Sequence, residues 1–431
     1  MSGEPPAGEP TPTAGDPIAA FYQRFPYPLR NPGEAATLEW VLPASLPAVA
    51  HHVFGGALPR GRPLRFLVAG GGTGDAVLSL GGWLRRLGIA GTIDYIDLSE
   101  RSCAIAQARA AAAGLDNVAF RLGPLEAVAE GPAAVYDYVD LCGVLNHVPD
   151  PVPALAALAH AILPGGGIGV MAYGGLGRTG AYEAQAALAM LGVDGTRPDG
   201  PALARAFVRG LPQSNWLRRN PAFANLADAD ESELADVLLN PRDRAFTTDD
   251  LDDLMRGAGL SIRGFTPPFL YDPVAALRDP VLNAAAAGLD RRARWRLAEL
   301  LQGSCRKHVF YARKPSPGAP GDIGDDPAEE LLAAPDTVLV PAGVDFPAVA
   351  AELAGTPAER RALQIAVDHR PVSVGIRLSS LDLAIMTAID GPTRVGDILA
   401  CLAGHPGDLQ AALGALQRRL TRLGLLYVMA G

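Results

Sequence analysis

The chain has 431 residues, of which 49% are hydrophobic, and its formal net charge is −9. This length favours two or three domains, and the hydrophobic content is sufficient for a sizeable core. The negative balance disfavours a general nucleic-acid binder, because phosphate binding requires a basic surface. Lys and Arg are not massed at either end of the chain, which disfavours an electrostatic membrane tether.

Four cysteines, Cys103, Cys142, Cys305 and Cys401, lie far apart and form no CxxC pair. A zinc ribbon or a thioredoxin motif is therefore disfavoured, and the pattern is typical of reduced thiols in a cytoplasmic protein. Residues 1–17 lack the basic start and apolar run of a signal peptide. No stretch has the length and apolar character of a membrane-spanning helix. We therefore expect a cytoplasmic protein that makes no membrane contact.

The first 175 residues divide into three regions of different composition and pattern. Residues 1–16 are rich in Pro, Gly and acidic residues and predict a disordered tail, and residues 17–62 predict a lid of short helices. From residue 63 to residue 175 strands alternate with helices. The expected strands cover residues 65–69, 92–96, 118–122, 135–141 and 168–172, and the expected helices cover residues 76–87, 100–113 and 152–162. This alternation predicts an α/β core with a doubly wound, mostly parallel sheet.

The second part predicts a cap, a return to the sheet and a separate small domain. Residues 176–256 form a mostly helical cap insertion, and residues 257–314 complete a seven-stranded sheet with strands near 260–265 and 308–312. Residues 315–334 are rich in Pro, Gly and Asp and predict a linker. Residues 335–431 predict a small α+β domain, with helices over 379–389 and 408–423 and a strand over 425–429.

The loop after the first strand carries the strongest chemical signal. Residues 68–75 read Val-Ala-Gly-Gly-Gly-Thr-Gly-Asp. Glycines allow positive φ and a close ligand approach, and the following helix presents its positive dipole end. The spacing of Gly70, Gly72 and Gly74 is GxGxG; a GxGxxG register would place a non-glycine residue last, which disfavours a nicotinamide oxidoreductase. A tight turn without a ligand is the alternative interpretation.

Asp97 follows at the end of the second strand. An acid at this distance from the glycine loop reaches ribose hydroxyls in such folds, and a carboxylate can accept hydrogen bonds from both hydroxyls of a vicinal diol. Alternatively, Asp97 caps the helix that begins near Glu100. Ser99 could serve as that cap equally well, which would leave Asp97 available for a ligand.

Five stretches in this order resemble the class I S-adenosylmethionine-dependent methyltransferases. They are residues 68–75, 96–99, 117–120, 136–139 with 143–147, and 163–167. Together they extend over residues 64–173, and the upstream pair Tyr27-Pro28 is similar to one found in methyltransferase-type proteins of bacteria. The resemblance implies a Rossmann-like sheet, S-adenosylmethionine as cofactor, and methyl transfer as activity.

The resemblance also assigns cofactor contacts along the chain. It places Ala69, Gly70, Gly72 and Gly74 at the methionine part, Asp97 at the ribose, Leu98, Gly123, Pro124 and Leu125 at the adenine, and Cys142 and Gly143 at the sulfonium or amino acid end. Many members of the family carry an acid at the positions of Val68 and Pro124. The absence of both acids motivates an alternative hypothesis, a catalytically degenerate domain that acts as a binding or assembly partner.

Candidate catalytic residues follow the fourth and fifth strands. Methyl transfer depends mainly on positioning and needs a base only for a protonated nucleophile. His147 could be that base, although a capping or packing role is the more common one for such a residue. Tyr173 and Arg178 follow the fifth strand, where ligands of open α/β sheets bind.

Five residues are candidates for binding the methyl acceptor: Tyr22, Tyr27, Tyr173, Arg178 and Tyr182. Arg178 could hold a substrate carboxylate or phosphate, or it could pair with an acid of the cap. Tyr22 and Tyr27 could close the site from the N-terminal segment. Core packing is expected of Phe21 and Phe25.

Other features predict partners only weakly. The histidines have no close His or Cys partners, so we expect no metal site. The basic run at residues 291–296 could touch an anionic partner but is more typical of a solvated helix face. The C-terminal domain resembles winged helices, and its eight Arg against nine acidic residues from Asp336 onward disfavour DNA binding. We expect that domain to mediate homodimerisation or recognition of a protein or peptide.

The sequence therefore predicts a methyltransferase that acts on O or N of a small-molecule or protein/peptide acceptor.

Overall fold

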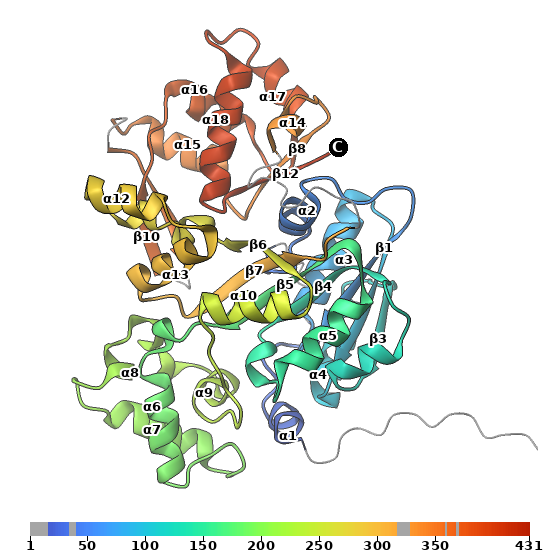
Figure 1. Ribbon diagram of the computed structural model, residues 1–431, viewed down its shortest axis with the longest axis vertical. Coiled ribbons are helices and arrows are strands. Elements are labelled where there is room, and N and C mark those ends of the chain that lie inside the picture. Colours follow the sequence, from blue (N-terminus) through green and yellow to red (C-terminus); the bar gives the residue numbers. More distant parts are fainter. Residues whose placement is uncertain (1–15, 34–39, 317–327, 358–359, 368–369) are drawn as a thin grey trace, which may run out of the picture.

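The computed structural model describes residues 16–33, 40–316, 328–357, 360–367 and 370–431. The predicted tail, except for Asp16, and part of the predicted linker lie outside these residues. Within them a seven-stranded sheet forms the centre of the molecule (Figure 1). Its strands are β1 (Leu64–Ala69), β2 (Gly91–Asp97), β3 (Val118–Leu122), β4 (Tyr136–Cys142), β5 (Ile162–Tyr173), β6 (Ser261–Thr266) and β7 (Lys307–Arg313).

The strand order is β3-β2-β1-β4-β5-β7-β6. Strands β1 to β5 pair in parallel, and β7 runs antiparallel between β5 and β6. The predicted mostly parallel, doubly wound α/β sheet is therefore confirmed. From β1 the chain proceeds to β2 and β3 on one side of the sheet, and then returns to form β4 and β5 on the other side of β1. In such sheets, ligands bind beyond the carboxyl ends of the strands at this point of reversal.

Helices cover both faces of the sheet because alternate strand residues point to opposite sides. One face packs against α2 (Leu46–Phe54), α3 (Asp75–Leu87) and α4 (Glu100–Ala112), with Phe66 and Val68 in the shared core. The other packs against η1 (Leu125–Glu130), α5 (Pro151–Ala161) and α10 (Thr248–Gly257), with Leu67 and Ala69 in the core. A chain segment between β6 and β7 adds η6 (Pro268–Tyr271), α11 (Pro273–Ala276), α12 (Pro280–Ala287) and α13 (Arg291–Gln302).

A group of helices follows β5, within the range proposed as a cap insertion. The cap contains η3 (Leu176–Arg178), α6 (Ala181–Met190), α7 (Gly200–Gly210), α8 (Trp216–Arg219), η4 (Pro221–Phe223), η5 (Leu226–Asp228) and α9 (Glu231–Leu238). Helix α10 packs on the sheet instead, because Leu251 and Met255 join the sheet core. The N-terminal helix α1 (Pro17–Arg24) packs on the cap, and Phe21 and Phe25 lie in the cap's own hydrophobic core.

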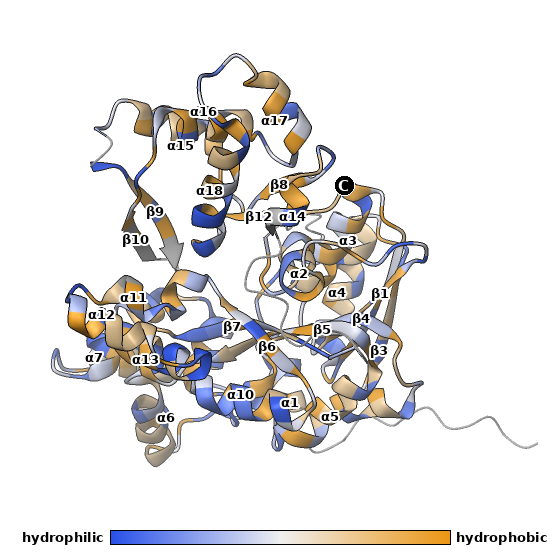
Figure 2. Cartoon of the chain, turned by 45° about the horizontal axis from the view of Figure 1, so that its top comes forward, coloured by the Kyte–Doolittle hydropathy of each residue, from blue (hydrophilic) through white to orange (hydrophobic). Residues whose placement is uncertain are grey.

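The C-terminal domain is built from helices around a three-stranded antiparallel sheet of order β11-β8-β12. Its elements are α14 (Ala328–Leu332), β8 (Val338–Pro341), α15 (Phe346–Ala354), β9 (Ala362–Val367), β10 (Arg370–Gly375), α16 (Ser380–Ala388), β11 (Thr393–Arg394), α17 (Val395–Cys401), α18 (Leu409–Arg422) and β12 (Leu426–Met429). The β9–β10 hairpin extends toward α11 and α12 (Figures 1 and 2). The winged-helix assignment stays a prediction. Among the helices the structure describes, none is long and apolar enough to cross a membrane.

Candidate active site

The glycine loop between β1 and α3 adopts backbone conformations that favour glycine. Gly70, Gly72 and Gly74 have φ of 67°, 51° and 96°. A Cβ on Gly72 would lie 2.8 Å from the carbonyl oxygen of Tyr27. Any larger residue at this position would collide with the N-terminal segment. The close packing of that segment on the loop therefore requires glycine here.

Asp97 holds this loop in place at the end of β2. One carboxylate oxygen accepts a hydrogen bond from Gly72 N at 2.8 Å, and the other accepts one from Ser99 N at 2.8 Å. The hydroxyl of Ser99, in turn, caps α4 by accepting from Ser102 N. The capping role therefore falls to Ser99. Burial raises the pKa of Asp97, and the backbone donors of Ser99, Gly72 and Leu98 oppose this rise. A carboxylate offers about four acceptor positions, so at least one remains for a ligand.

The structure brings the predicted cofactor residues together at one edge of the sheet. Ala69, Asp97 and Cys142 end β1, β2 and β4, and Leu98, Gly123, Pro124, Leu125 and Gly143 follow within a few residues of β2, β3 and β4. Gly123 N donates to Asp97 O at 2.9 Å, and Gly143 N donates to Met171 O at 3.0 Å. The edge therefore presents backbone, apolar and carboxylate groups along the ends of four adjacent strands.

The N-terminal segment lies across the same edge. Thr73 donates its hydroxyl hydrogen to Pro28 O at 2.8 Å, and Arg30 makes an ion pair of 2.7 Å with Asp75 at the start of α3. Gln23 accepts from Arg101 N at 3.0 Å. The sequence did not single out Gln23 or Arg30, because their partners are distant in the chain and no local pattern marks them.

His147 lies on η2 (Leu145–His147), directly after β4, and its side chain is 5% exposed. Its Nδ1 atom lies 2.6 Å from the carbonyl oxygen of Arg242. A carbonyl can only accept, so Nδ1 carries a hydrogen, and in the neutral ring Nε2 keeps a lone pair. Within the described ranges Nε2 has no hydrogen-bond partner. Other buried side-chain atoms of the described residues also lack a partner, and one of them, Asn146 Oδ1, belongs to the preceding residue. Just beyond the end of β4, these two atoms leave polar groups available to a ligand.

Two tyrosines flank this imidazole. The rings of Tyr22 and Tyr173 each meet the His147 ring edge-on, with centroids 5.8 Å apart. Their hydroxyls both donate to Asp236 of α9, at 2.8 and 3.0 Å. Asn240 donates to the Tyr22 oxygen at 3.1 Å. Burial raises the pKa of both tyrosines well above the usual range, so they stay neutral donors.

Arg178 and Tyr182 lie next to this group. Arg178 is 2% exposed, forms an ion pair with Asp243 and stacks 4.0 Å from the centroid of the Tyr173 ring. Its Nε donates to Tyr182 at 3.1 Å. Of the two roles considered for Arg178, the structure therefore shows the pairing with an acid of the cap insertion. Burial raises the pKa of Tyr182 to about 12.

Sequence reasoning missed Asp236, Asn240 and Asp243, which complete this site from the cap. Asp236 lies on α9, whereas Asn240 and Asp243 lie in the loop that follows this helix. Nothing in their spacing distinguishes these polar residues from solvated ones. Only the fold brings Asp236 to Tyr22, which lies 214 positions away in the chain.

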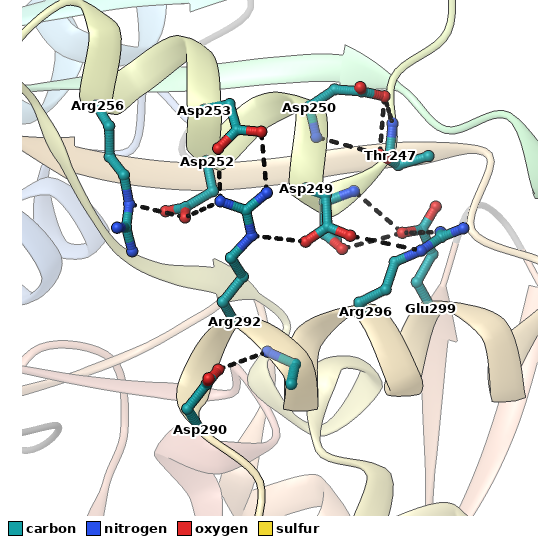
Figure 3. Close-up of polar contacts among 12 residues, drawn as sticks. Thr247, Asp249, Asp250, Asp252, Asp253, Arg256, Asp290, Arg292, Arg296 and Glu299 are labelled. Atoms are coloured by element: carbon teal, nitrogen blue, oxygen red, sulfur yellow. Dashed lines mark hydrogen bonds and ion pairs between the residues drawn. The ribbon is translucent and has the colours of Figure 1, made fainter.

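Two arginines of the basic run on α13 pair with acids of α10 and of α13 itself (Figure 3). Arg292 pairs with Asp249 at 2.8 Å and with Asp253, and Arg296 pairs with Glu299 at 2.8 Å. These arginines bind acids of their own chain, which disfavours the anionic-partner alternative. Among the described residues no group of three His, Cys, Asp or Glu is placed to hold a metal ion.

Comparisons with known proteins agree with this geometry. A family model described as "Methyltransferase domain" matches residues 67–168. The chain is 31% identical over 316 residues to an uncharacterized protein of Synechococcus sp., covering 70% of this chain and 72% of that protein. It is 39% identical over 75 residues to a ubiquinone biosynthesis O-methyltransferase of Paracidovorax citrulli, but these cover only 17% of this chain and 32% of that enzyme.

Among solved structures, PKMT2 from Rickettsia typhi in complex with AdoHcy superposes with a TM-score of 0.60 at 15% identity, covering 90% of this chain and 75% of that one. At 15% identity this superposition shows a shared fold and no more. The chain belongs to the class I S-adenosylmethionine-dependent methyltransferases.

Proposed function

We propose that this protein transfers a methyl group from S-adenosylmethionine to an oxygen or nitrogen of an acceptor that binds beside His147, between Tyr22 and Tyr173. The observation that carries the proposal is the buried Nε2 atom of His147, which has its lone pair fixed and no partner among the described residues. It lies just beyond the end of β4, next to the edge that holds the predicted cofactor residues.

The residues at that edge fit S-adenosylmethionine. The remaining acceptor capacity of Asp97 suits a ribose hydroxyl, and Leu98 with Leu125 offers apolar surface to an adenine. The bound cofactor would supply an activated methyl group on a sulfonium. Many members of the family carry an acid at the position of Val68, but here this valine is fully buried in the sheet core. The carboxylate that contacts the glycine loop is that of Asp97.

The protein's own groups would act on the acceptor. As the acceptor atom attacks, its proton passes to His147 Nε2, while the carbonyl of Arg242 keeps the ring in the required orientation. The resulting imidazolium would lie in the field of Asp243, which stabilises positive charge in a buried site. Tyr22 and Tyr173 position the acceptor and exclude water.

His147→Gln tests this role. We expect the rate of methyl transfer to fall by about 10²–10⁴-fold, the usual contribution of a general base, while the affinity for S-adenosylhomocysteine stays the same. The measurement is the transfer of labelled methyl from the cofactor, with an acceptor first identified by screening amines, alcohols and peptides. His160→Gln, at an exposed position of α5, is the matched control. An undiminished rate in folded His147→Gln would exclude the base.

Two further proposals concern the whole chain. Cys103, Cys142, Cys305 and Cys401 are all free thiols, which supports a reducing, cytoplasmic location. The C-terminal domain is proposed to dimerise or to recognise a protein or peptide. If S-adenosylhomocysteine binds but no acceptor is ever methylated, the binding or assembly role becomes the better account.

A further inference from the structure

Helix α12 exposes apolar side chains that the helices of a folded chain normally bury. Val281 is 76% exposed and Leu282 is 56% exposed, and Ala286 is the one residue of this helix that is buried. Leu289, just beyond the helix, is 40% exposed. The helix lies at the periphery of the molecule in two views (Figures 1 and 2). Contiguous apolar surface of this kind marks a site of interaction with another macromolecule.

The exposed side chains lie on one face of the helix. Val281 and Ala285 are one turn apart, and Leu282 lies beside them. Gly288 keeps a helical backbone conformation, so Leu289 continues the same line. Ala285, which is exposed too, separates the larger residues with a short side chain that lets a second helix approach closely. This α12 face, made of Val281, Leu282, Ala285 and Leu289, therefore suits a helix as its partner.

The two ends of the α12 face carry opposite charges that lack an ion-pair partner among the described residues. Arg278 precedes the helix and is exposed. Asp290 follows it, is exposed, and accepts a hydrogen bond from Ala293 N at 2.8 Å. Asp279, beside Arg278, is turned onto the start of the helix, where it accepts from two backbone amides. A matching partner presents an apolar helix with an acid opposite Arg278 and a base opposite Asp290.

We propose that the α12 face is the interface of a symmetric homodimer, in which α12 packs antiparallel against α12 of a second copy. A two-fold axis brings the same surface of both copies together. Arg278 and Asp290 are equally far in sequence from the middle of the helix, so Arg278 lies opposite Asp290 of the partner subunit. A parallel pair would bring like charges together, and complementary charges fix the orientation more than the affinity. The interface belongs to the segment between β6 and β7, which leaves the C-terminal domain free for a protein or peptide.

Analytical ultracentrifugation of the full chain, from low to high micromolar concentration, tests the interface. We expect a concentration-dependent dimer for the wild type, and dimerisation weakened about 100-fold or more in Leu282→Glu, because the new charge would be buried without a partner. Met190→Glu makes the same kind of change on the cap, at a position that is 89% exposed, and should leave the dimer intact. A wild type that stays monomeric would overturn the inference. A dimer that Leu282→Glu does not weaken would also overturn it and would assign dimerisation to another surface.

Cysteine cross-linking tests the antiparallel arrangement. A residue close to the two-fold axis faces its own copy, so Ala285→Cys should form a disulfide-linked dimer on mild oxidation. The background is Cys401→Ser, which removes the exposed native thiol, and the control is Ala287→Cys, an exposed position on another side of the same helix. Arg278→Glu should weaken the dimer about tenfold, because it places two acids opposite each other. Cross-linking at position 287 in preference to position 285, or an unchanged dimer in Arg278→Glu, would overturn the antiparallel pairing.

Discussion

Asp140 is a buried carboxyl in the sheet core that lowers the stability of the folded state at high pH. It lies within β4, is 2% exposed, and its Oδ1 atom has no partner in the described part of the chain. Burial raises the pKa of this carboxyl to about 8. Because the folded-state pKa lies above the unfolded value near 4, the folded state holds a proton that the unfolded state loses between these values. Stability is therefore lost as the pH rises from about 4 to about 8.

Asp140→Asn should remove this loss. We expect the variant to match the wild type near pH 4 and to exceed its free energy of unfolding by about 1–3 kcal/mol near pH 8, because the amide never becomes charged in the core. Urea denaturation at the two pH values measures the difference, with Asp116→Asn as an exposed control. A stability gain that is equal at both pH values would contradict the assignment to Asp140.

At the scale of elements, the N-terminal segment joins the two halves of the site. Tyr22 and Arg24 of α1 bind the cap, through Asp236 and through the carbonyl oxygen of Gly195. Arg30 binds Asp75 at the start of α3. The segment therefore reaches from the proposed acceptor side to the glycine loop, and we expect cofactor exchange to depend on its movement.

Arg30→Gln should loosen this segment. Loss of the ion pair removes its anchor on α3, so we expect faster amide deuterium uptake in residues 25–30 and faster release of S-adenosylhomocysteine. Hydrogen exchange followed by mass spectrometry and stopped-flow release measure the two effects. The control is Arg65→Gln, which removes a weaker, exposed pair with Asp94. Unchanged uptake in Arg30→Gln would show that the anchor lies elsewhere.

The elements themselves could be predicted because their signals are local. Strand–helix alternation predicted the doubly wound, mostly parallel sheet, and the spacing of Gly70, Gly72, Gly74 and Asp97 predicted where a cofactor would bind. The acceptor side could not be predicted in the same way. The carboxylate that joins Tyr22 to Tyr173 comes from a cap helix far along the chain, and helical periodicity reports which face of α9 is buried but not what it meets.

At the scale of the whole molecule, the C-terminal domain shares a core with the sheet domain. The Tyr427 ring of β12 stacks on Trp40 with centroids 6.0 Å apart and also contacts His52 of α2. Tyr427 and Met429 belong to the same buried cluster as Phe66 of β1. Ala430 N donates to Gly56 O at 2.8 Å. A continuous core of this kind couples the unfolding of the two parts.

Tyr427→Ala tests that coupling. We expect the wild type to unfold in one calorimetric transition, and the variant to lose about 3–5 kcal/mol, typical of a large aromatic removed from a core, with the C-terminal domain melting first. Trp216→Ala, at a position that is 58% exposed, should have little effect. Two separate transitions in the wild type would contradict a shared core.

The most direct test of the central claim is a calorimetric titration with S-adenosylhomocysteine of the wild type and Asp97→Ala. We expect one-to-one binding at micromolar ligand, weakened in Asp97→Ala by about 1–3 kcal/mol because buried polar groups lose their partner. Asp94→Asn, on the same strand, should bind like the wild type. No binding at millimolar ligand, or equal affinity in folded Asp97→Ala, would contradict a cofactor site at the ends of β1 and β2.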